Sequence, residues 1–381
     1  MAGPPRLSGL LAALTTFSAN AQTDTATPPN PELPPVTVEG TAGSLTVPNA
    51  TAAEARIREI PGSAAVVDAE SYENTRAVTI KDMLDYVPGV YAQPRYAEEL
   101  RLSIRGSGLS RTFHLRGIGL FQDGIPINLA DGGGDFQDID PLAFQYVEVL
   151  KGANALELGV AALGGAINFV TPTGYDADRL KLRLEGGSFN TGRAQIATGN
   201  VIDQGDYFLS VSHLRSDGFR DFMDQGNTRL FSNAGYRLND DLETRFYLTY
   251  GDINQELPGS LSKAQLKDDP SQANPGNVRN NYQRDFKVLR VANKTTWKGE
   301  DQEITGGVYA INKQLYHPIF QLIDQDSMDY GAYATFRQNG ELAGHANRLT
   351  VGTRVGTGDT DSRRYVNLAG DYGDLTSNAR E

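Results

Sequence analysis

The stretch that decides the fold runs from Tyr146 to Thr171 and reads YVEVLKGANALELGVAALGGAINFVT. Its two apolar runs, 147–150 and 166–170, predict short buried strands. Glycines at positions 152, 159, 164 and 165 indicate tight turns and close approach of the backbone. A glycine-rich turn between buried strands in any α+β domain would have the same pattern. Long alternating strands follow, so we place a domain boundary after residue 174.

The composition limits the classes of protein to which the chain can belong. Its 381 residues leave room for two or more domains, and its net charge of −12 argues against a nucleic-acid partner. The absence of cysteine excludes a disulfide scaffold and a thiolate metal site. No run of 18 apolar residues occurs beyond the N-terminus, so any region that crosses a membrane would have to consist of strands.

Residues 1–21 have the pattern of a secretory signal peptide. Arg6 supplies a positive charge, Leu7–Phe17 is a short apolar region, and Ala19-Asn20-Ala21 is a cleavage site of the A-x-A type. The alternative is a buried N-terminal helix. Cleavage after Ala21 would place the mature protein beyond the inner membrane.

Residues 22–55 are rich in Thr, Pro, Ala and Asn and are predicted to be disordered, because they can bury little apolar surface. Within them, the sequence LPPVTVE at 33–39 favours an extended strand, since prolines precede β-branched residues. An ordinary proline-rich linker would have the same local pattern.

Residues 56–174 are predicted to form a domain that contains one amphipathic helix. Thr79 and Asp82 make a capping pair, and Ile80, Met83 and Leu84 begin one buried stripe. Three polar segments, 93–100, 107–112 and 130–138, flank the predicted strands. Asp131, Asp135, Asp138 and Asp140, in and just after the third segment, could hold Ca²⁺, although turns of the Asp-Gly type explain them more simply.

From residue 175 onward, apolar and polar side chains alternate with a period of two. Phe246 and Leu248, for example, face one way, and Glu243 and Arg245 face the other. The strands run for about ten residues, which is the length of a tilted transmembrane strand. A soluble β-sandwich would alternate in the same way.

The lengths of the connections favour a membrane barrel over the sandwich, because short turns alternate with long loops. The short connections are 201–206, 239–241, 298–301 and 340–346, and the long ones are 217–227, 255–285 and 313–328. We count about nine strands, whereas plugged outer-membrane transporters have 22. The sequence therefore predicts a truncated barrel or a fragment of one.

The stretch at 146–171 resembles the end of the plug domain of TonB-dependent outer-membrane receptors. The runs RGIGLFQDGIPIN at 116–128 and ADGGGD at 130–135 resemble in particular the receptors for ferric citrate and similar siderophores. The resemblance implies an α+β plug domain, residues 56–174. It also implies that an antiparallel transmembrane β-barrel, of which residues 175–381 form the N-terminal part, follows the plug.

The same resemblance implies roles for particular residues. The segment at 33–39 is similar to the TonB box, which adds as a strand to the energy-transducing TonB protein. Its residues are Leu33, Pro34, Pro35, Val36, Thr37, Val38 and Glu39. The polar segments would form the outward tips of the plug, where the ligand is met. The candidate ligand-binding residues there are Arg95, Tyr96, Arg111, Asp131, Phe136 and Gln137.

The resemblance implies active uptake of a ferric siderophore or similar iron chelate across the outer membrane of a Gram-negative bacterium. The plug and the N-terminus would lie on the periplasmic side, and the barrel would contact outer-membrane lipid. Two alternatives are a passive porin or surface adhesin, and a truncated product without transport. No catalytic motif is present, and we expect no enzyme activity, no cofactor and no metal site, with iron only as part of the transported chelate.

Overall fold

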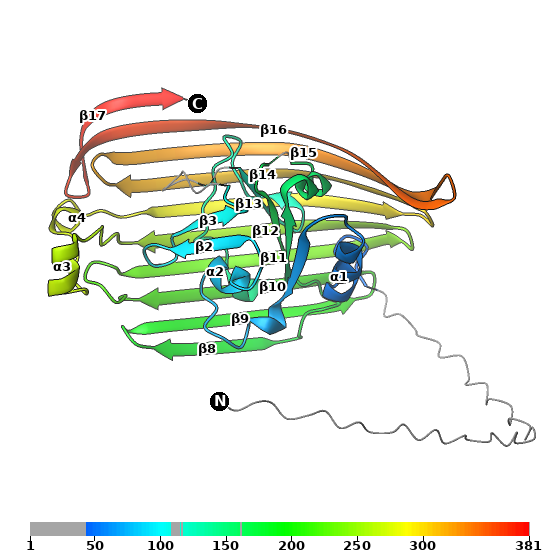
Figure 1. Cartoon of the computed structure of the whole chain (residues 1–381), viewed down its shortest axis with the longest axis horizontal. Coiled ribbons are helices and arrows are strands. Elements are labelled where there is room, and N and C mark those ends of the chain that lie inside the picture. Colours follow the sequence, from blue (N-terminus) through cyan, green and yellow to red (C-terminus); the bar gives the residue numbers. More distant parts are fainter. Residues whose placement is uncertain (1–42, 108–114, 116, 161, 381) are drawn as a thin grey trace, which may run out of the picture. The chain divides into compact units, whose positions relative to one another are not determined.

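The computed structural model describes residues 43–107, 115, 117–160 and 162–380. The predicted signal peptide, the predicted TonB box and Arg111 lie outside these residues. Residues 43–174 form an N-terminal domain, and residues 175–380 form one large antiparallel sheet (Figure 1).

The N-terminal domain is built around a five-stranded sheet of order β1-β6-β7-β4-β5, with a separate β2-β3 hairpin. Its strands are β1 (Ala64–Asp68), β2 (Val90–Pro94), β3 (Leu100–Ile104), β4 (Ile118–Gln122), β5 (Ile125–Pro126), β6 (Tyr146–Lys151) and β7 (Gly165–Val170). Its helices are α1 (Ala50–Arg58) and α2 (Ile80–Leu84), with 3-10 turns at Ala69–Ser71, Pro141–Ala143 and Gly152–Leu158.

The stretch quoted first forms the centre of this sheet. β6 and β7 pair antiparallel, with Val147 opposite Phe169, and every residue of both strands is buried. Gly165 begins β7 at a φ of +127°, and a Cβ atom there would lie 2.1 Å from the carbonyl oxygen of Leu150. Only glycine allows the two strands to approach so closely.

The predicted helix and its buried stripe are confirmed, although the helix is short. Thr79 and Asp82 form a reciprocal capping box at the start of α2. Ile80, Met83 and Leu84 are at most 2% exposed and belong to the main core of the domain. The core therefore lies between α2, the hairpin and one face of the five-stranded sheet.

Residues 43–55 are ordered, contrary to the prediction that disorder extends to residue 55. Asn49 caps α1, which begins at Ala50, and Val47 is 2% exposed beside Ala53 and Tyr146. The composition suggested disorder because the segment has few large apolar side chains. Hydrogen bonds from Ser44 and Thr46 to Glu243, about 200 positions away, also hold the segment.

The large sheet has ten strands in sequence order, one more than the sequence predicted. They are β8 (Lys181–Gly187), β9 (Thr191–Ile202), β10 (Gly205–Ser216), β11 (Gln225–Asn239), β12 (Leu242–Gln255), β13 (Asp285–Lys298), β14 (Gln302–Pro318), β15 (Leu322–Leu342), β16 (His345–Leu368) and β17 (Asp371–Arg380). Within the described residues the sheet does not close, and β8 and β17 are its edges. Several strands greatly exceed the predicted length, since β16 alone spans 24 residues.

The two ends of the large sheet differ. One end, here called the turn end, carries the tight turns between β9 and β10, β11 and β12, β13 and β14, and β15 and β16. The other, the loop end, carries the connection 256–284 with helices α3 (Lys263–Asp268) and α4 (Pro275–Arg279). The predicted long loop 313–328 is wrong, because β14 and β15 continue through it to a turn at 319–321.

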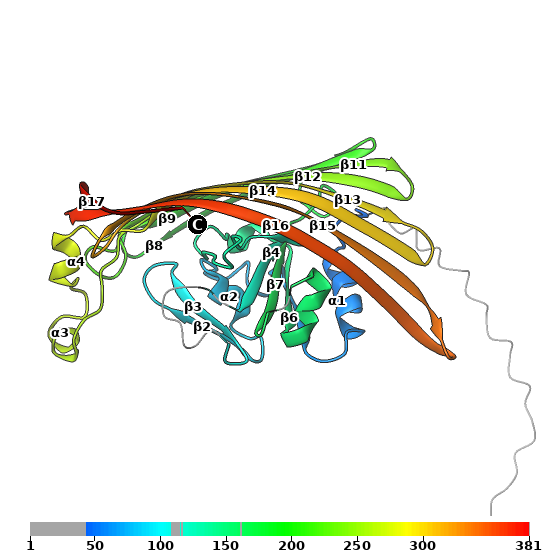
Figure 2. The same ribbon diagram turned by 90° about the horizontal axis from the view of Figure 1, so that it is seen from above.

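The two faces of the sheet also differ, and the N-terminal domain lies against one of them (Figure 2). We call this the inner face, where Tyr247 is 5% exposed and Arg245 is fully buried. On the outer face, Phe246 is 62% exposed, Val308 57% and Val355 66%. The predicted alternation thus separates an apolar outer face from a polar inner face. No helix among the described residues is long and apolar enough to cross a bilayer.

Candidate functional site

Pairs of opposite charge make up much of the contact between the N-terminal domain and the inner face, beside an apolar contact between Phe144 and Phe231. The domain supplies carboxylates, and the sheet supplies arginines and a lysine. The pairs are Glu98 with Arg229, Asp140 with Arg193, Asp138 with Arg290, and Asp135 with both Arg284 and Lys313. Breaking a buried pair of this kind by removing one partner leaves the other charge uncompensated and strongly destabilises the fold.

Two of these carboxylates respond differently to burial. Burial would raise the pKa of Asp140, but the charges of Arg193 and Arg229 outweigh it and hold this pKa below its ordinary value. Burial also raises the pKa of Glu98, and there Arg229 offsets the rise only in part. Asp140 also accepts hydrogen bonds from Ser212 and from the backbone of Leu142, and these lower its pKa further.

At the loop end, the tip of the N-terminal domain meets two strands of the sheet. Asp135 lies 2.5 Å from Arg284 and also pairs with Lys313, whose ammonium group lies 5.0 Å from the ring centre of Phe286. Burial would raise the pKa of Asp135, but these two cations lower it below its ordinary value. Asp329 of β15 accepts a hydrogen bond of 2.6 Å from the backbone of Ala130 and holds the same loop.

Arg95 and Tyr96, two of the predicted ligand-binding residues, lie in the turn between β2 and β3. Arg95 is 3.8 Å from Glu99, and the Tyr96 hydroxyl is 3.1 Å from that of Ser260 in the long connection. Gln255 donates a hydrogen bond of 3.0 Å to the carbonyl oxygen of Tyr96. This turn therefore lies at the loop end of the sheet.

The other predicted ligand residues have different surroundings. Asp131 is exposed, and its carboxylate accepts a hydrogen bond of 2.7 Å from the backbone of Gly133. Phe136 is 8% exposed in the main core, and Gln137 is 2% exposed. The carbonyl oxygen of Gln137 accepts a hydrogen bond of 2.7 Å from Arg229. The structure thus gives Phe136 and Gln137 a packing role and leaves Asp131 open to solvent.

The acidic residues that could have suggested Ca²⁺ serve as partners for cations instead. Asp135, Asp138 and Asp140 each contact an arginine of the sheet. Among the described residues, no group of three or more His, Cys, Asp or Glu is arranged to hold a metal ion. Sequence reasoning noticed these aspartates but missed their partners, which lie 53 to 178 positions away. The sequence did contain one indication of these partners, because several predicted strands carry a basic residue at an inner-face position.

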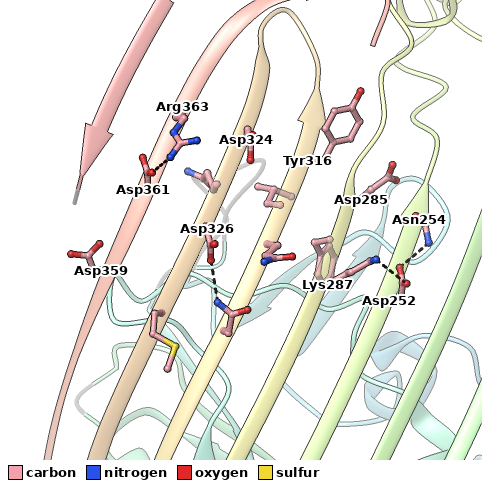
Figure 3. Close-up of a pocket in the computed structure, with 16 residues that line it drawn as sticks. Asp252, Asn254, Asp285, Lys287, Tyr316, Asp324, Asp326, Asp359, Asp361 and Arg363 are labelled. Atoms are coloured by element: carbon pink, nitrogen blue, oxygen red, sulfur yellow. Dashed lines mark hydrogen bonds and ion pairs between the residues drawn. The ribbon is translucent and has the colours of Figure 1, made fainter. Parts of the chain in front are cut away.

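A groove of about 690 Å³ crosses the loop end of the sheet from β12 to β16 (Figure 3). Six aspartates contribute to its lining, with Lys287 and Arg363; they are Asp252, Asp285, Asp324, Asp326, Asp359 and Asp361. These side chains alternate with buried inner-face residues such as Ile253, so they lie on the outer face. The groove therefore marks where the outer face becomes hydrophilic, and it does not adjoin the turn that carries Arg95.

At the turn end, Arg245 joins three parts of the chain. It donates to both carboxylate oxygens of Asp206, at 2.8 and 2.7 Å, and to Glu243 at 2.9 Å. It also donates to Thr46 at 2.9 Å. Asp206 in turn accepts a hydrogen bond of 2.9 Å from the backbone of Gly174. This arginine thus connects the sheet, the start of the N-terminal domain and the end of that domain.

Comparison with known proteins agrees with this architecture. Residues 56–166 match the TonB-dependent receptor plug domain. The chain is 22% identical over 337 residues to the ferric-pyoverdine receptor PbuA of a Pseudomonas species, covering 80% of this chain and 39% of that protein. It is 27% identical over 216 residues to the vitamin B12 transporter BtuB of Vibrio vulnificus, covering 55% and 33%.

Solved structures show the same fold. The ferric citrate transporter FecA in its unliganded form matches with a TM-score of 0.69 and 20% identity, over 89% of this chain and 54% of that one. The pyoverdine receptor FpvA from Pseudomonas aeruginosa, bound to pyoverdine, matches with a TM-score of 0.65 and 15% identity, over 85% and 52%. The chain therefore spans about half or less of the length of these proteins.

Proposed function

We propose that this chain, which belongs to the TonB-dependent receptors by its plug domain and its fold, takes part in active uptake of an iron chelate across the outer membrane. The observation that carries the proposal is a folded plug against the polar face of a sheet whose opposite face is apolar. The relatives named above are receptors and transporters rather than enzymes.

The chemistry of the loop end favours an anionic ligand. Arg95, Arg284 and Lys313 gather there beside the plug tip, and guanidinium groups bind carboxylates with charge-assisted hydrogen bonds. With Arg111, Tyr96 and Asp131, they are the residues that we propose for contact with a ferric siderophore or a similar chelate. The receptors for ferric pyoverdine and ferric citrate among the similar proteins support this class.

The plug–sheet contact suits a plug that has to move. Charged and hydrogen-bonding groups can exchange their protein partners for water, whereas separated apolar faces would remain exposed to it. The contact between plug and inner face contains the ion pairs described above and several buried polar atoms without a protein partner, such as Asp138 Oδ1 and Arg290 Nη2. We propose that the TonB protein binds residues 33–39 and pulls, and that water enters the contact as the plug shifts.

Uptake by the full-length protein in cells tests this proposal. Deletion of Leu33–Glu39 is expected to abolish uptake of the labelled chelate while its binding to the cells remains. An uncoupler is expected to have the same effect. Uptake that survives both treatments would favour a passive porin and would contradict the proposal.

A further inference from the structure

The peptide that follows the predicted TonB box is held on the sheet by a single buried carboxylate. Ser44 and Thr46 donate their hydroxyl hydrogens to Glu243 Oε1, each at 2.7 Å. The backbone N–H of Leu45 donates to Glu243 Oε2 at 2.8 Å. The Glu243 side chain is 1% exposed. Three successive residues of the segment therefore share one acceptor on β12.

Arg245 holds that carboxylate in place and makes two more contacts with the segment. It donates to Thr46 Oγ1 at 2.9 Å and to Ser44 Oγ at 3.2 Å. Its guanidinium is fully buried and also bonds to Asp206 and to Asn233. Because Asp206 on β10 and Asn233 on β11 fix the position of the Arg245 guanidinium, the Arg245–Glu243 pair is held in place without any help from the segment.

The attachment is mainly polar and can therefore be undone in water. Val47 contributes an apolar contact, whereas Ser44 and Thr46 are held by hydrogen bonds. Hydrogen bonds to a charged group are stronger than those between neutral groups, but water can replace these partners when the segment leaves. The segment is thus held firmly at rest, and its release leaves little apolar surface exposed.

We propose that Glu243 and Arg245 form a latch that retains residues 43–47 and that opens before the plug moves. The inference rests on the proposed function, since it assigns a pulling force to residues 33–39. Three residues, 40–42, separate that segment from Gly43, so tension reaches the latch before it reaches α1.

The latch also connects the two ends of the plug. Asp206 accepts from the backbone of Gly174, and Asn233 donates to Thr171 Oγ1 at 3.0 Å. Arg245 in turn donates hydrogen bonds to the Asp206 carboxylate and to Asn233 Oδ1. When the segment leaves, Glu243 loses three donors and water enters beside Arg245, which loosens the junction between plug and sheet at residues 171–174.

Because the chain contains no cysteine, a single Leu45→Cys substitution provides a clean reporter. We would compare the rate at which a water-soluble maleimide labels this cysteine in the full chain, inserted in membranes, with and without Glu243→Gln. The amide replaces one acceptor oxygen with a donor, so labelling is expected to become at least about tenfold faster. The control is Glu303→Gln, which removes a carboxylate that pairs with Arg337 and does not touch the segment.

A second variant protects the test against misfolding of the sheet. Ser44→Ala combined with Thr46→Ala leaves the sheet unchanged and is expected to accelerate labelling in the same way. Equal labelling rates in the native chain and in this double variant would overturn the latch. The assay needs neither ligand nor partner, so a chain that labels as expected but does not take up iron would contradict only the proposed function.

Discussion

At the scale of single residues, the plug is held by charges that are no longer exposed to water. Glu98 and Arg229 are both 1% exposed, whereas Glu54 and Arg58 form an exposed pair on α1. A buried pair contributes little net free energy when intact, but removal of one partner leaves a charge without compensation. Exposed pairs contribute less than about 1 kcal/mol.

We therefore expect Glu98→Ala to destabilise the plug by about 3–5 kcal/mol. Glu54→Ala, the matched exposed variant, should change stability by less than about 0.5 kcal/mol. Limited proteolysis of the plug along a urea series would measure both. Similar midpoints for the two variants would show that Arg229 is not desolvated in solution.

Asp123 makes the stability of the plug depend on pH. It accepts hydrogen bonds from the backbone and hydroxyl of Thr171, at 2.9 and 2.8 Å. Burial raises the pKa of its carboxyl from 3.8 to about 6, although both contacts oppose the rise. The folded state therefore binds the proton more tightly than the unfolded state does.

The stabilisation from this proton is complete below pH 3.8 and is lost as the pH rises through about 6. Between these values, the native plug should lose stability with rising pH, and Asp123→Asn should flatten that dependence. Urea midpoints measured from pH 4 to pH 7 would test this. An unchanged slope in the variant would assign the dependence to other groups.

At the scale of elements, the sequence predicted what depends on a repeating pattern and missed what depends on distant partners. The alternation of Phe246 and Leu248 with Arg245 and Tyr247 correctly separated the two faces of β12. The sequence predicts a loop at 313–328 because polar residues predominate there and the regular alternation is weak near the loop end. Arg245 could not be recognised, since its partners lie up to 201 positions away.

The β6–β7 pair provides an element-scale prediction with an internal control. Gly165→Ala would place a methyl group against the backbone of Leu150 at a positive φ. We expect this to lower the free energy of unfolding of the plug by about 3 kcal/mol or more. Gly186→Ala on β8 meets nothing within 4 Å and should be tolerated. Proteolysis of the plug along a urea series distinguishes the two, and a tolerated Gly165→Ala would show that the strands can separate at this end.

At the scale of the whole molecule, the outer face has two bands along β14. Val308 is 57% exposed in the apolar part of the face, beside Val355 two strands away. Asn312, on the same face of the same strand, lies at the acidic groove near the loop end. If lipid covers the first band and water the second, the two positions must respond differently to a charge.

We expect Val308→Arg to lower the free energy of unfolding of the protein in the bilayer by about 2–4 kcal/mol, as arginine does near the middle of a bilayer. Asn312→Arg should cost less than about 1 kcal/mol, because it adds a cation among aspartates in water. The measurement is the urea midpoint of the full-length protein in lipid vesicles, followed by its heat-dependent migration on a gel. Equal costs at the two positions would mean that lipid does not cover this face. The uptake proposal would then lose its physical basis, because a sheet outside a membrane lines no pore for the plug to close.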